Sequence, residues 1–374
     1  MHSEEDRDSA HLHMIVVGTR PEIIKMAPVI KVLQKQRMPF VLVHTAQHYD
    51  YNLSLQFFQE LKLPKPDYNL KIGSATHAEQ TAKAMVAIEK TIMKEKPEAI
   101  LIEGDTNTTL AAGLAAIKLH TPIGHVESGL RSYDLRMPEE HNRRIVDHIS
   151  TYLFAPTKKA ATVLQEENVW GRIFITGNTV IDACMQHVPI AERKSKIMNK
   201  IKYRDFALIT AHRAENVDSP ENLEKLIEVF LSLPIASVFP VHPRTKNRLM
   251  KTKLWKKLSS SENTQILPPV GYLDFLLLMK ASTIILTDSG GIQEEATSPN
   301  IRKQVLVLRK LTERPEAVEA GFAKVVGLDP KNVLQEVEIA LKRKKDLPKA
   351  SPFGDGNAGE RIGEIMRKAT GMDR

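Results

Sequence analysis

The stretch TIILTDSGGIQEEA (residues 283–296) joins a short apolar run directly to the start of a predicted helix. Several aliphatic residues in succession are typical of a strand that is buried on both faces of a sheet. Glycine opens helices poorly, so the glycine pair needs a reason other than helix propensity. A buried strand that turns directly into a helix is the repeating unit of parallel α/β proteins.

The same alternation of apolar runs and helical stretches extends over the whole chain. Strands alternating with helices form right-handed βαβ units, which build doubly wound parallel sheets. A chain of 374 residues is long enough for two such domains. We therefore predict an α/β fold with two doubly wound, Rossmann-like parallel sheets. The predicted strands are 14–18, 40–45, 99–105, 122–127, 173–177, 206–212, 237–242, 264–268, 283–288 and 304–308, and the predicted helices are 22–36, 52–62, 77–94, 107–118, 139–149, 157–167, 220–231, 272–280, 290–297, 330–343 and 358–370.

The boundary between the two domains is expected near residues 178–204. The polar stretch AERKSKIMNKIKYRD (191–205) interrupts the alternation there. The final helix, 358–370, is amphipathic and can pack on either domain.

Composition disfavours several classes of protein. The net charge is +8, but the basic residues are dispersed and aromatic residues make up 5%, which disfavours a nucleic-acid-binding protein. No apolar run approaches the roughly 18 residues of a membrane-spanning helix. Cys184 is the single cysteine, which rules out an intrachain disulfide and favours the cytoplasm. Residues 1–13 are polar, and we expect a disordered or vector-derived lead-in rather than a secretory signal.

The glycine pair leaves the first N–H groups of its predicted helix uncovered. Without Cβ atoms, these donors can approach a diphosphate closely, and the helix dipole favours an anion there. We expect Ser289 to cap the helix and Glu295 (or Glu294) to accept hydrogen bonds from ribose hydroxyls. The stretch therefore predicts a nucleotide-diphosphate site, although an ordinary helix start with acids in its first turn would have the same composition.

Basic residues follow several other predicted strands. They occur in the motifs GTRPE, AHRAEN and TERPEAVEAG, near predicted strand ends where open α/β sheets bind their ligands. A diphosphate group would be bound by such cations. The candidates are Arg20, Lys25, His212, Arg213 and Arg314.

Acidic residues form a second group. Asp105 and Glu127 end apolar strands of one predicted sheet, where an unpaired carboxylate is costly, and Glu139 follows in the motif MPEE. Helix capping would also explain each acid taken singly. Together with the cations they predict proton transfer on a sugar nucleotide, in an active site at the cleft between the two domains.

Metal and redox cofactors are not expected. The sequence has no HExxH motif and no cysteine pair, and no GxGxxG motif follows the first strand. We therefore predict neither a bound metal nor a nicotinamide cofactor.

Taken together, the motifs resemble those of the non-hydrolysing UDP-N-acetylglucosamine 2-epimerases. They occur in the order of that family, from about Met14 to the C-terminus. The motifs are GTRPEIIKMAPVI, TAQH, GDTNTTLA, HVESGLRS, MPEEHNRR, FAPT, TGNTVID, TAHRAEN, VHP, TDSGGIQEEA and TERPEAVEAG.

The resemblance implies a glycosyltransferase type B-like fold whose C-terminal helix returns to the first domain. The domains would then be 14–177 with 357–374, and 178–356. It implies reversible conversion of UDP-GlcNAc to UDP-ManNAc, by elimination of UDP to 2-acetamidoglucal and re-addition. It further implies a homodimer that uses no metal or redox cofactor. With the composition, we expect a cytoplasmic protein that binds neither nucleic acid nor a membrane.

The resemblance also assigns roles to the candidate residues. It marks Asp105, Glu127 and Glu139 as catalytic carboxylates, His212 as the histidine beside the leaving phosphate, and Arg143 as a further substrate ligand. The predicted catalytic residues are therefore Asp105, Glu127, Glu139 and His212, and the predicted ligands of the UDP-sugar are Arg20, Lys25, Arg143, Arg213, Ser289, Gly290, Gly291, Glu295 and Arg314.

Three other enzymes remain compatible with these motifs. A 2-epimerase of a related UDP-2-acetamido sugar would share MPEEHNRRIVDH and AHRAENVDSPENL. A type B glycosyltransferase would use the same diphosphate site, but it would leave the three carboxylates without a common purpose. A hydrolysing epimerase would release free ManNAc and UDP.

Overall fold

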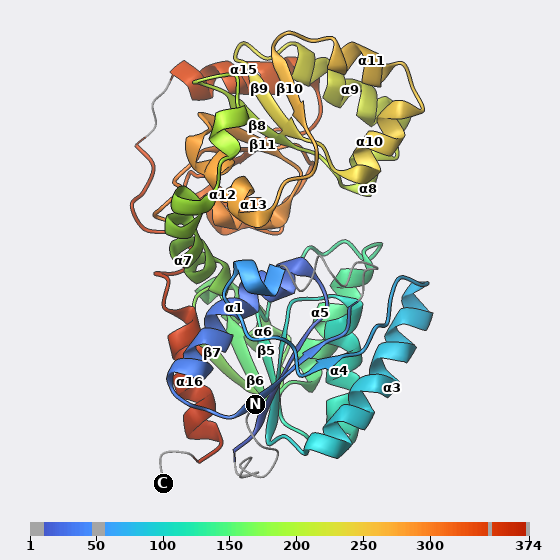
Figure 1. Cartoon of the computed structure of the whole chain (residues 1–374), viewed down its shortest axis with the longest axis vertical. Helices are drawn as coiled ribbons and strands as arrows, with labels where there is room; N and C mark the ends of the chain where they lie inside the picture. The colour runs from blue at the N-terminus through green and yellow to red at the C-terminus, as the bar shows by residue number, and fades with distance from the viewer. Residues whose placement is uncertain (1–10, 47–56, 343–345, 372–374) are drawn as a thin grey trace. The chain divides into compact units, whose positions relative to one another are not determined.

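The computed structural model describes residues 11–46, 57–342 and 346–371, which form two compact units (Figure 1). The described residues of Met1–Ala183 and Gly354–Arg374 form unit 1, and those of Cys184–Phe353 form unit 2. The division between them falls inside helix α7 (Thr179–Lys194), so residues 191–194 of the polar stretch are helical.

Unit 1 contains a parallel sheet of seven strands in the order β3-β2-β1-β4-β5-β6-β7. Helices cover both faces of the sheet (Figure 1). Side chains of β1 and β4 such as Val16 and Ile102 pack against Ile88 and Ala112 on two of these helices. The strands are β1 (His13–Val17), β2 (Phe40–His44), β3 (Tyr68–Asn69), β4 (Ala99–Glu103), β5 (Ile123–Val126), β6 (Tyr152–Ala155) and β7 (Arg172–Ile175), and the helices besides α7 are α1 (Arg20–Lys35), α3 (His77–Glu95), α4 (Asn107–Lys118), α5 (Pro138–Ile149), α6 (Lys158–Glu166) and α16 (Ala358–Ala369).

Unit 2 repeats this plan with a parallel sheet of six strands in the order β10-β9-β8-β11-β12-β13. Its core joins strand residues such as Phe239 and Leu286 to Phe230 and Val333 on the helices. The strands are β8 (Ala207–Thr210), β9 (Ser237–Pro240), β10 (Thr264–Leu267), β11 (Ile284–Thr287), β12 (Val305–Val307) and β13 (Ala323–Val325), and the helices are η2 (Ile197–Lys200), α8 (Ala214–Val217), α9 (Pro220–Leu231), α10 (Pro243–Met250), α11 (Leu254–Ser259), α12 (Tyr272–Ala281), α13 (Gly290–Glu295), α14 (Pro315–Glu319) and α15 (Pro330–Lys342).

Both sheets reverse their strand order once, between β1 and β4 in unit 1 and between β8 and β11 in unit 2. Crossover connections leave such a point in opposite directions, so a crevice opens at the carboxyl ends of the two strands. The predicted fold class, two doubly wound parallel sheets of the glycosyltransferase type B kind, is confirmed. Each sheet therefore offers one ligand-binding end.

The predicted strands are confirmed to within a residue or two at each end. Sequence reasoning missed β3, β6 and β13, each of four residues or fewer, and also α7, α8, α10, α11 and α14. Residues 52–56 of the helix expected at 52–62, and residues 1–10 of the expected lead-in, lie outside the described residues. Leu12 is buried in the core of unit 1, and His13 pairs with Phe40 and Ala99 as the first residue of β1.

Helix α16 packs along α1, far away in sequence (Figure 1). Two glycines allow the close approach. A Cβ atom at Gly359 would lie 3.1 Å from the backbone of Pro28, and one at Gly363 would lie 2.5 Å from Val32 Cγ1. The C-terminal helix is therefore part of unit 1.

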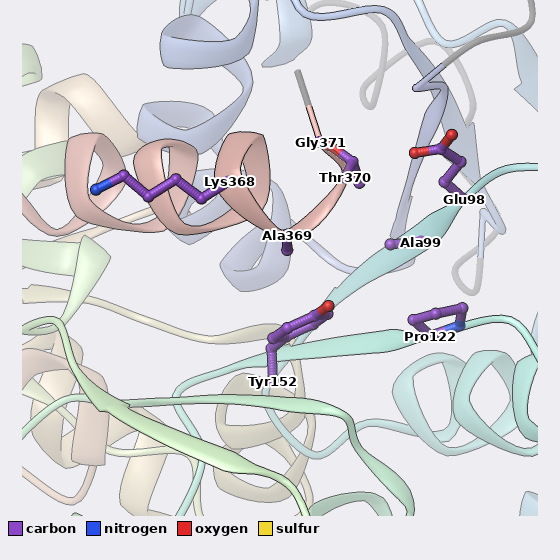
Figure 2. Close-up of a pocket in the computed structure, with 8 residues that line it drawn as sticks. All are labelled: Glu98, Ala99, Pro122, Tyr152, Lys368, Ala369, Thr370 and Gly371. Carbon is purple, nitrogen blue, oxygen red and sulfur yellow. The ribbon is translucent and has the colours of Figure 1, made fainter. Parts of the chain in front are cut away.

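A cavity of about 490 Å³ lies at the amino ends of the strands of unit 1, beside the end of α16 (Figure 2). It is lined by residues at the amino ends of the central strands, including Ala99, Pro122 and Tyr152, and by the end of α16. Ligands of doubly wound sheets bind at the carboxyl ends instead, so this cavity is separate from the predicted site. Within the described residues, no helix is both long and apolar enough to cross a membrane.

Candidate functional site

The loops after β1 and β4 meet at the point where the strand order reverses in unit 1. Glu22, on the first turn of α1, is buried between them. Its carboxylate accepts hydrogen bonds from Gly18 N at 3.0 Å and Thr19 N at 2.5 Å, and from Thr106 Oγ1 at 2.8 Å. Burial raises the pKa of Glu22, and these hydrogen bonds oppose the rise. Glu22 thus fixes the loop that begins α1 against the loop that carries Asp105.

Lys25 lies between two buried carboxylates on neighbouring strands. Its Nζ atom is 2.5 Å from Glu127 Oε2 and 3.1 Å from Glu103 Oε1. Asn178 Nδ2 donates a second hydrogen bond to Glu127 Oε2 at 2.9 Å. The structure therefore places Lys25, predicted as a diphosphate ligand, beside the acids. Its contact with phosphate stays a prediction.

Glu127 combines burial with an uncommon backbone conformation. Its φ angle is +66°, in the left-handed region that non-glycine residues seldom occupy. Such conformations cost free energy, persist only where the surroundings enforce them, and cluster at functional sites. The conformation supports a functional role for Glu127.

Glu103, the last residue of β4, was not among the predicted site residues. Burial raises its pKa well above the ordinary value, and the charges of Glu127 and Glu22 add to the rise while Lys25 opposes it. The signal was present in the sequence. Glu103 ends the apolar run AILIE, the same position at a strand end that singled out Asp105 and Glu127.

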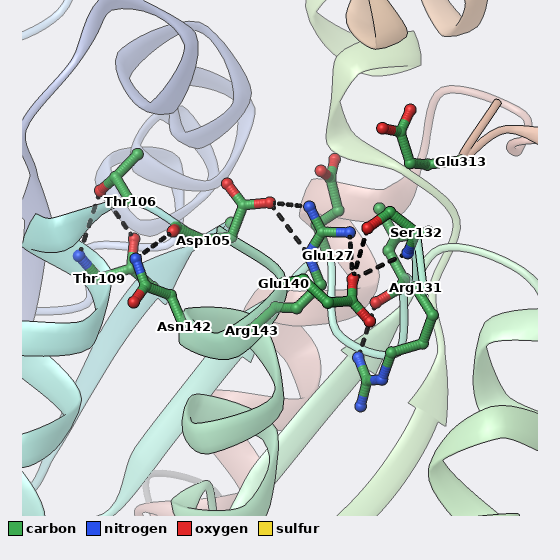
Figure 3. Close-up of polar contacts among 12 residues, drawn as sticks. Asp105, Thr106, Thr109, Glu127, Arg131, Ser132, Glu140, Asn142, Arg143 and Glu313 are labelled. Carbon is green, nitrogen blue, oxygen red and sulfur yellow. Dashed lines mark hydrogen bonds and ion pairs between the residues drawn. The ribbon is translucent and has the colours of Figure 1, made fainter. Parts of the chain in front are cut away.

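Asp105 is held by α5 (Figure 3). Arg143 donates to Asp105 Oδ2 through Nε at 3.1 Å and through a terminal nitrogen as well. Asn142 Nδ2 donates to the Asp105 carbonyl oxygen at 2.9 Å. Arg143 was predicted as a substrate ligand, and Asn142 was not predicted. Their contacts show that α5 sets both the charge environment and the position of Asp105.

The two glutamates at the start of α5 differ in their surroundings. Glu139 is partly exposed, whereas Glu140 is fully buried. Glu140 accepts hydrogen bonds from Ser132 N at 2.8 Å and Arg144 Nε at 3.0 Å, and it also pairs with Arg143 (Figure 3). Burial alone would raise the pKa of Glu140, but the hydrogen bonds from Ser132 and the charge of Arg143 lower it. Glu140 therefore anchors α5, and Glu139 is the acid with access to solvent.

In unit 2, Asp288 organises the loop after β8. This buried carboxylate accepts hydrogen bonds from the backbone N–H groups of His212 and Arg213, at 3.0 Å and 2.9 Å, and from Asn216 Nδ2 at 3.1 Å. The His212 ring lies against it, with Nδ1 3.4 Å from Asp288 Oδ1. Burial lowers the pKa of His212, and the charge of Asp288 opposes this change. Asp288 thus fixes the backbone of two predicted site residues, the catalytic candidate His212 and the ligand candidate Arg213.

The glycine pair begins α13, as predicted, but Ser289 does not cap it as expected. Ser289 occupies the N-cap position, but its side chain accepts no hydrogen bond from the first N–H groups of the helix. Its backbone N–H donates to Thr287 Oγ1 at 3.0 Å. A Cβ atom at Gly291 would meet nothing within 4 Å, and one at Gly290 would lie 3.7 Å from Glu313 Oε2. The protein's own packing therefore leaves room above both glycines, which agrees with a bound group approaching them.

Arginine side chains surround this helix start. A Cβ atom on Gly290 would lie 3.9 Å from Arg314 Cζ and 4.0 Å from an Arg213 terminal nitrogen. Arg314 Nε is also 2.5 Å from Glu294 Oε1, inside the unit. Burial would raise the pKa of Glu313, but Arg309, Arg314 and Arg213 lower it to about 2. The helix start thus carries concentrated positive charge, partly balanced by buried acids.

Two further predicted residues have distinct surroundings. Arg20, the first residue of α1, places its guanidinium 4.8 Å from the centre of the Phe57 ring. Glu295, the predicted ribose ligand, is largely buried on α13. Within the described part of the chain, no three His, Cys, Asp or Glu side chains gather in a way that could hold a metal ion.

Comparison with known proteins identifies relatives along nearly the whole chain. The family model described as UDP-N-acetylglucosamine 2-epimerase matches residues 31–367. The UDP-N-acetylglucosamine 2-epimerase of Methanocaldococcus jannaschii is 47% identical over 361 residues, which cover 94% of this chain and 98% of that protein. The UDP-2,3-diacetamido-2,3-dideoxy-D-glucuronate 2-epimerase of Pseudomonas aeruginosa is 37% identical over 362 residues, 95% of this chain and 99% of that protein.

A solved structure gives the same match in three dimensions. The crystal structure of the Methanocaldococcus jannaschii UDP-GlcNAc 2-epimerase in complex with UDP-GlcNAc and UDP superimposes with a TM-score of 0.88 at 46% identity. The match covers 96% of this chain and 99% of that one.

Proposed function

This chain belongs to the UDP-N-acetylglucosamine 2-epimerase family, and we propose that it interconverts UDP-GlcNAc and UDP-ManNAc by eliminating and re-adding UDP. The observation that carries this proposal is the position of two acids on adjacent strands of unit 1. Asp105 and Glu127 follow β4 and β5, and each is paired with a basic side chain. Acids and bases placed at one end of a sheet are what a proton transfer at carbon requires.

The chemistry explains why more than one acid is needed. The C2 proton of an N-acetylhexosamine has no adjacent carbonyl and is not acidic. Breaking the bond between C1 and the diphosphate gives C1 oxocarbenium character, which acidifies the C2 proton. A base then removes this proton and leaves 2-acetamidoglucal and UDP. Return of a proton to the opposite face of C2, with re-addition of UDP at C1, gives the epimer, so the two faces need separate groups.

Unit 1 supplies the acid–base groups in this proposal. Lys25 and Asn178 hold Glu127, and Arg143 holds Asp105, so both carboxylates are fixed in position. Glu139, partly exposed on α5, is the third candidate.

Unit 2 binds the UDP group. The developing charge on the leaving diphosphate is stabilised by positive groups, and such electrostatic stabilisation is usually the largest contribution to catalysis. Arg213, Arg314 and the N–H groups of Gly290 and Gly291 provide it, with His212 beside them and Glu295 on the ribose. From the resemblance we further expect a cytoplasmic homodimer.

Proton NMR of UDP-GlcNAc with the purified protein in D2O tests the proposal. We expect UDP-ManNAc to accumulate with deuterium at C2, because the proton returned to C2 comes from a group that exchanges with solvent. Epimerisation with retained C2 protium would exclude this elimination. An unchanged C2 configuration without an acceptor would point to a glycosyltransferase, and free ManNAc would point to a hydrolysing enzyme.

A 2-epimerase of a related sugar is the second candidate. The name of the Pseudomonas aeruginosa relative gives a UDP-2,3-diacetamido-2,3-dideoxy-D-glucuronate as its substrate. The same assay with both UDP-sugars decides between them. The identities of 47% and 37% favour UDP-GlcNAc, so we expect the larger kcat/KM with that substrate.

A further inference from the structure

A buried histidine–aspartate pair lies beneath the two catalytic carboxylates of unit 1. His125, on β5, and Asp147, on α5, are both completely buried. His125 Nδ1 is 2.7 Å from Asp147 Oδ1, and His125 Nε2 is 2.8 Å from the carbonyl oxygen of Gly104. Neither residue has a part in the proposed chemistry.

Both ring nitrogens of His125 face acceptors. A carbonyl oxygen can only accept, and the Asp147 carboxylate stays ionised because His125 and Arg131 lower its pKa against the effect of burial. The His125 ring therefore bridges the Asp147 carboxylate and the Gly104 carbonyl oxygen. Arg131 also pairs with Asp147, at 2.7 Å, and with Glu167, at 2.6 Å.

The pair reaches the backbone beside both catalytic acids. Gly104, bound by the His125 ring, immediately precedes Asp105. Gly129, whose N–H donates to Asp147 Oδ2 at 3.2 Å, follows Glu127 by two residues. Through one hydrogen-bonded pair, the loop that carries Asp105 is therefore joined to the turn that carries Glu127.

The turn that Asp147 holds includes an uncommon backbone conformation. Glu127 has a φ angle of +66°, in the left-handed region, whereas Gly104 and Gly129, at +76° and +84°, are glycines that adopt this region readily. A strained or uncommon backbone conformation persists only where the surrounding contacts enforce it. The hydrogen bonds from His125 and to Asp147 are contacts of this kind.

We infer that His125 and Asp147 are positioning residues, which set the place of Asp105 relative to Glu127 for the epimerisation. This inference rests on the proposed function, because it assigns the pair a role in the same proton transfers. The pair acts through the backbone and does not touch the substrate. Its loss therefore slows the chemical step and leaves the binding of UDP, a property of unit 2, unchanged.

Two variants of His125 separate the two hydrogen bonds of its ring. His125→Asn keeps a donor at the place of Nδ1, facing Asp147, and loses the donor to Gly104. His125→Gln keeps a donor near the place of Nε2, facing Gly104, and loses the one to Asp147. Both variants remove the imidazole ring, so each is the matched control of the other for a loss of packing.

We expect His125→Asn to lower kcat by roughly 10- to 100-fold, because a misplacement of about 1 Å can cost about 100-fold. His125→Gln should keep a clearly higher kcat, and KM and the UDP dissociation constant should stay close to the parental values in both. In the double variant with Asp105→Asn, kcat should fall no further than in Asp105→Asn alone, because residues that act as a unit are not additive.

Equal kcat losses in the two His125 variants would overturn the inference and leave the pair a purely structural contact. Additive losses in the double variant would overturn it as well. If Asp105→Asn itself keeps parental turnover, the proposed role of Asp105 is wrong. If Asp105→Asn is slow and His125→Asn is as fast as the parent, the positioning role is wrong and the proposed function stands.

Discussion

The Lys25 ammonium group lies 2.5 Å from Glu127 Oε2, a contact between side chains 102 residues apart in sequence. The same ammonium is 3.1 Å from Glu103, so it is shared by two buried acids. Removing one partner of a buried ion pair leaves uncompensated charge and typically costs about 3–5 kcal/mol.

Lys25→Met should therefore lower the free energy of unfolding by about that amount in urea, and it should reduce kcat because Glu127 loses its fixed position. Adding Glu103→Gln should restore part of the stability. The UDP affinity of Lys25→Met, measured by calorimetry on the folded protein, tests the predicted diphosphate contact of Lys25. It should fall if Lys25 binds the diphosphate, and an affinity equal to that of the parent would confine Lys25 to the two acids.

Asp105→Asn and Glu127→Gln keep the shape of each side chain and remove its basicity. We expect turnover to fall by about 10²- to 10⁴-fold in each, the usual size of general acid–base catalysis. UDP affinity should survive, because its predicted ligands lie mostly in unit 2. Near-parental turnover in a folded variant would exclude that residue from the proton transfers.

Glu139→Gln and Glu140→Gln form a matched pair on one helix turn. Glu139 is partly exposed, so its variant should keep the parental Tm and lose turnover if the acid takes part in catalysis. Glu140 is buried against Ser132, Arg143 and Arg144, so its variant should lower the Tm. The reverse pattern would assign the catalytic role to Glu140.

Glu295→Ala should weaken UDP binding by about 1.5–3 kcal/mol, the usual contribution of hydrogen bonds to a charged group. Glu294→Gln is the comparison, since Glu294 is buried against Arg314 and its loss should mainly destabilise unit 2. Calorimetric titration with UDP decides the point. Unchanged affinity in Glu295→Ala would remove Glu295 from the ribose contact.

Asp182 should give unit 1 a pH-dependent stability. Burial raises its pKa from 3.8 to about 6, while the backbone N–H of Gly359, 2.8 Å away, opposes the rise. Between pH 3.8 and about pH 6, the folded chain keeps the Asp182 proton while the unfolded chain has released it. The contribution of Asp182 to the free energy of unfolding is therefore fully present below about pH 4 and is lost as the pH rises through 6. About two pKa units correspond to about 3 kcal/mol.

Asp182→Asn should remove this fall, as measured by urea unfolding at pH 4 and pH 7. Asp205→Asn, a change at an exposed aspartate, is the control and should keep the parental pH dependence. A parental slope in Asp182→Asn would show that other groups cause it.

Local patterns predicted most of the fold, because an apolar run followed by a turn and an amphipathic stretch needs no distant information. The missed strand β6 is a four-residue stretch, YLFA, that becomes a strand by pairing with β5 and β7. Helix α7 was missed because its polar end was taken for a domain boundary. Such outcomes depend on contacts that a single segment does not encode.

Within the site, residue types at strand ends were predictable and their partners were not. Glu103 could have been found by the rule that selected Asp105 and Glu127. The pairing of Lys25 with the acids depends on how α1 crosses the sheet, and the different burial of Glu139 and Glu140 depends on how α5 docks. A sequence motif contains no information on either the crossing of α1 or the docking of α5.

The return of α16 to α1 has a consequence for synthesis on the ribosome. Unit 2 is complete once residue 353 has emerged, but unit 1 still lacks the helix that covers Pro28 and Val32. Domains usually fold in the order of their translation, yet here the domain that begins first is finished last. A nascent chain stalled before residue 354 should therefore hold a protease-resistant second domain and a first domain whose α1 surface is still open to chaperones.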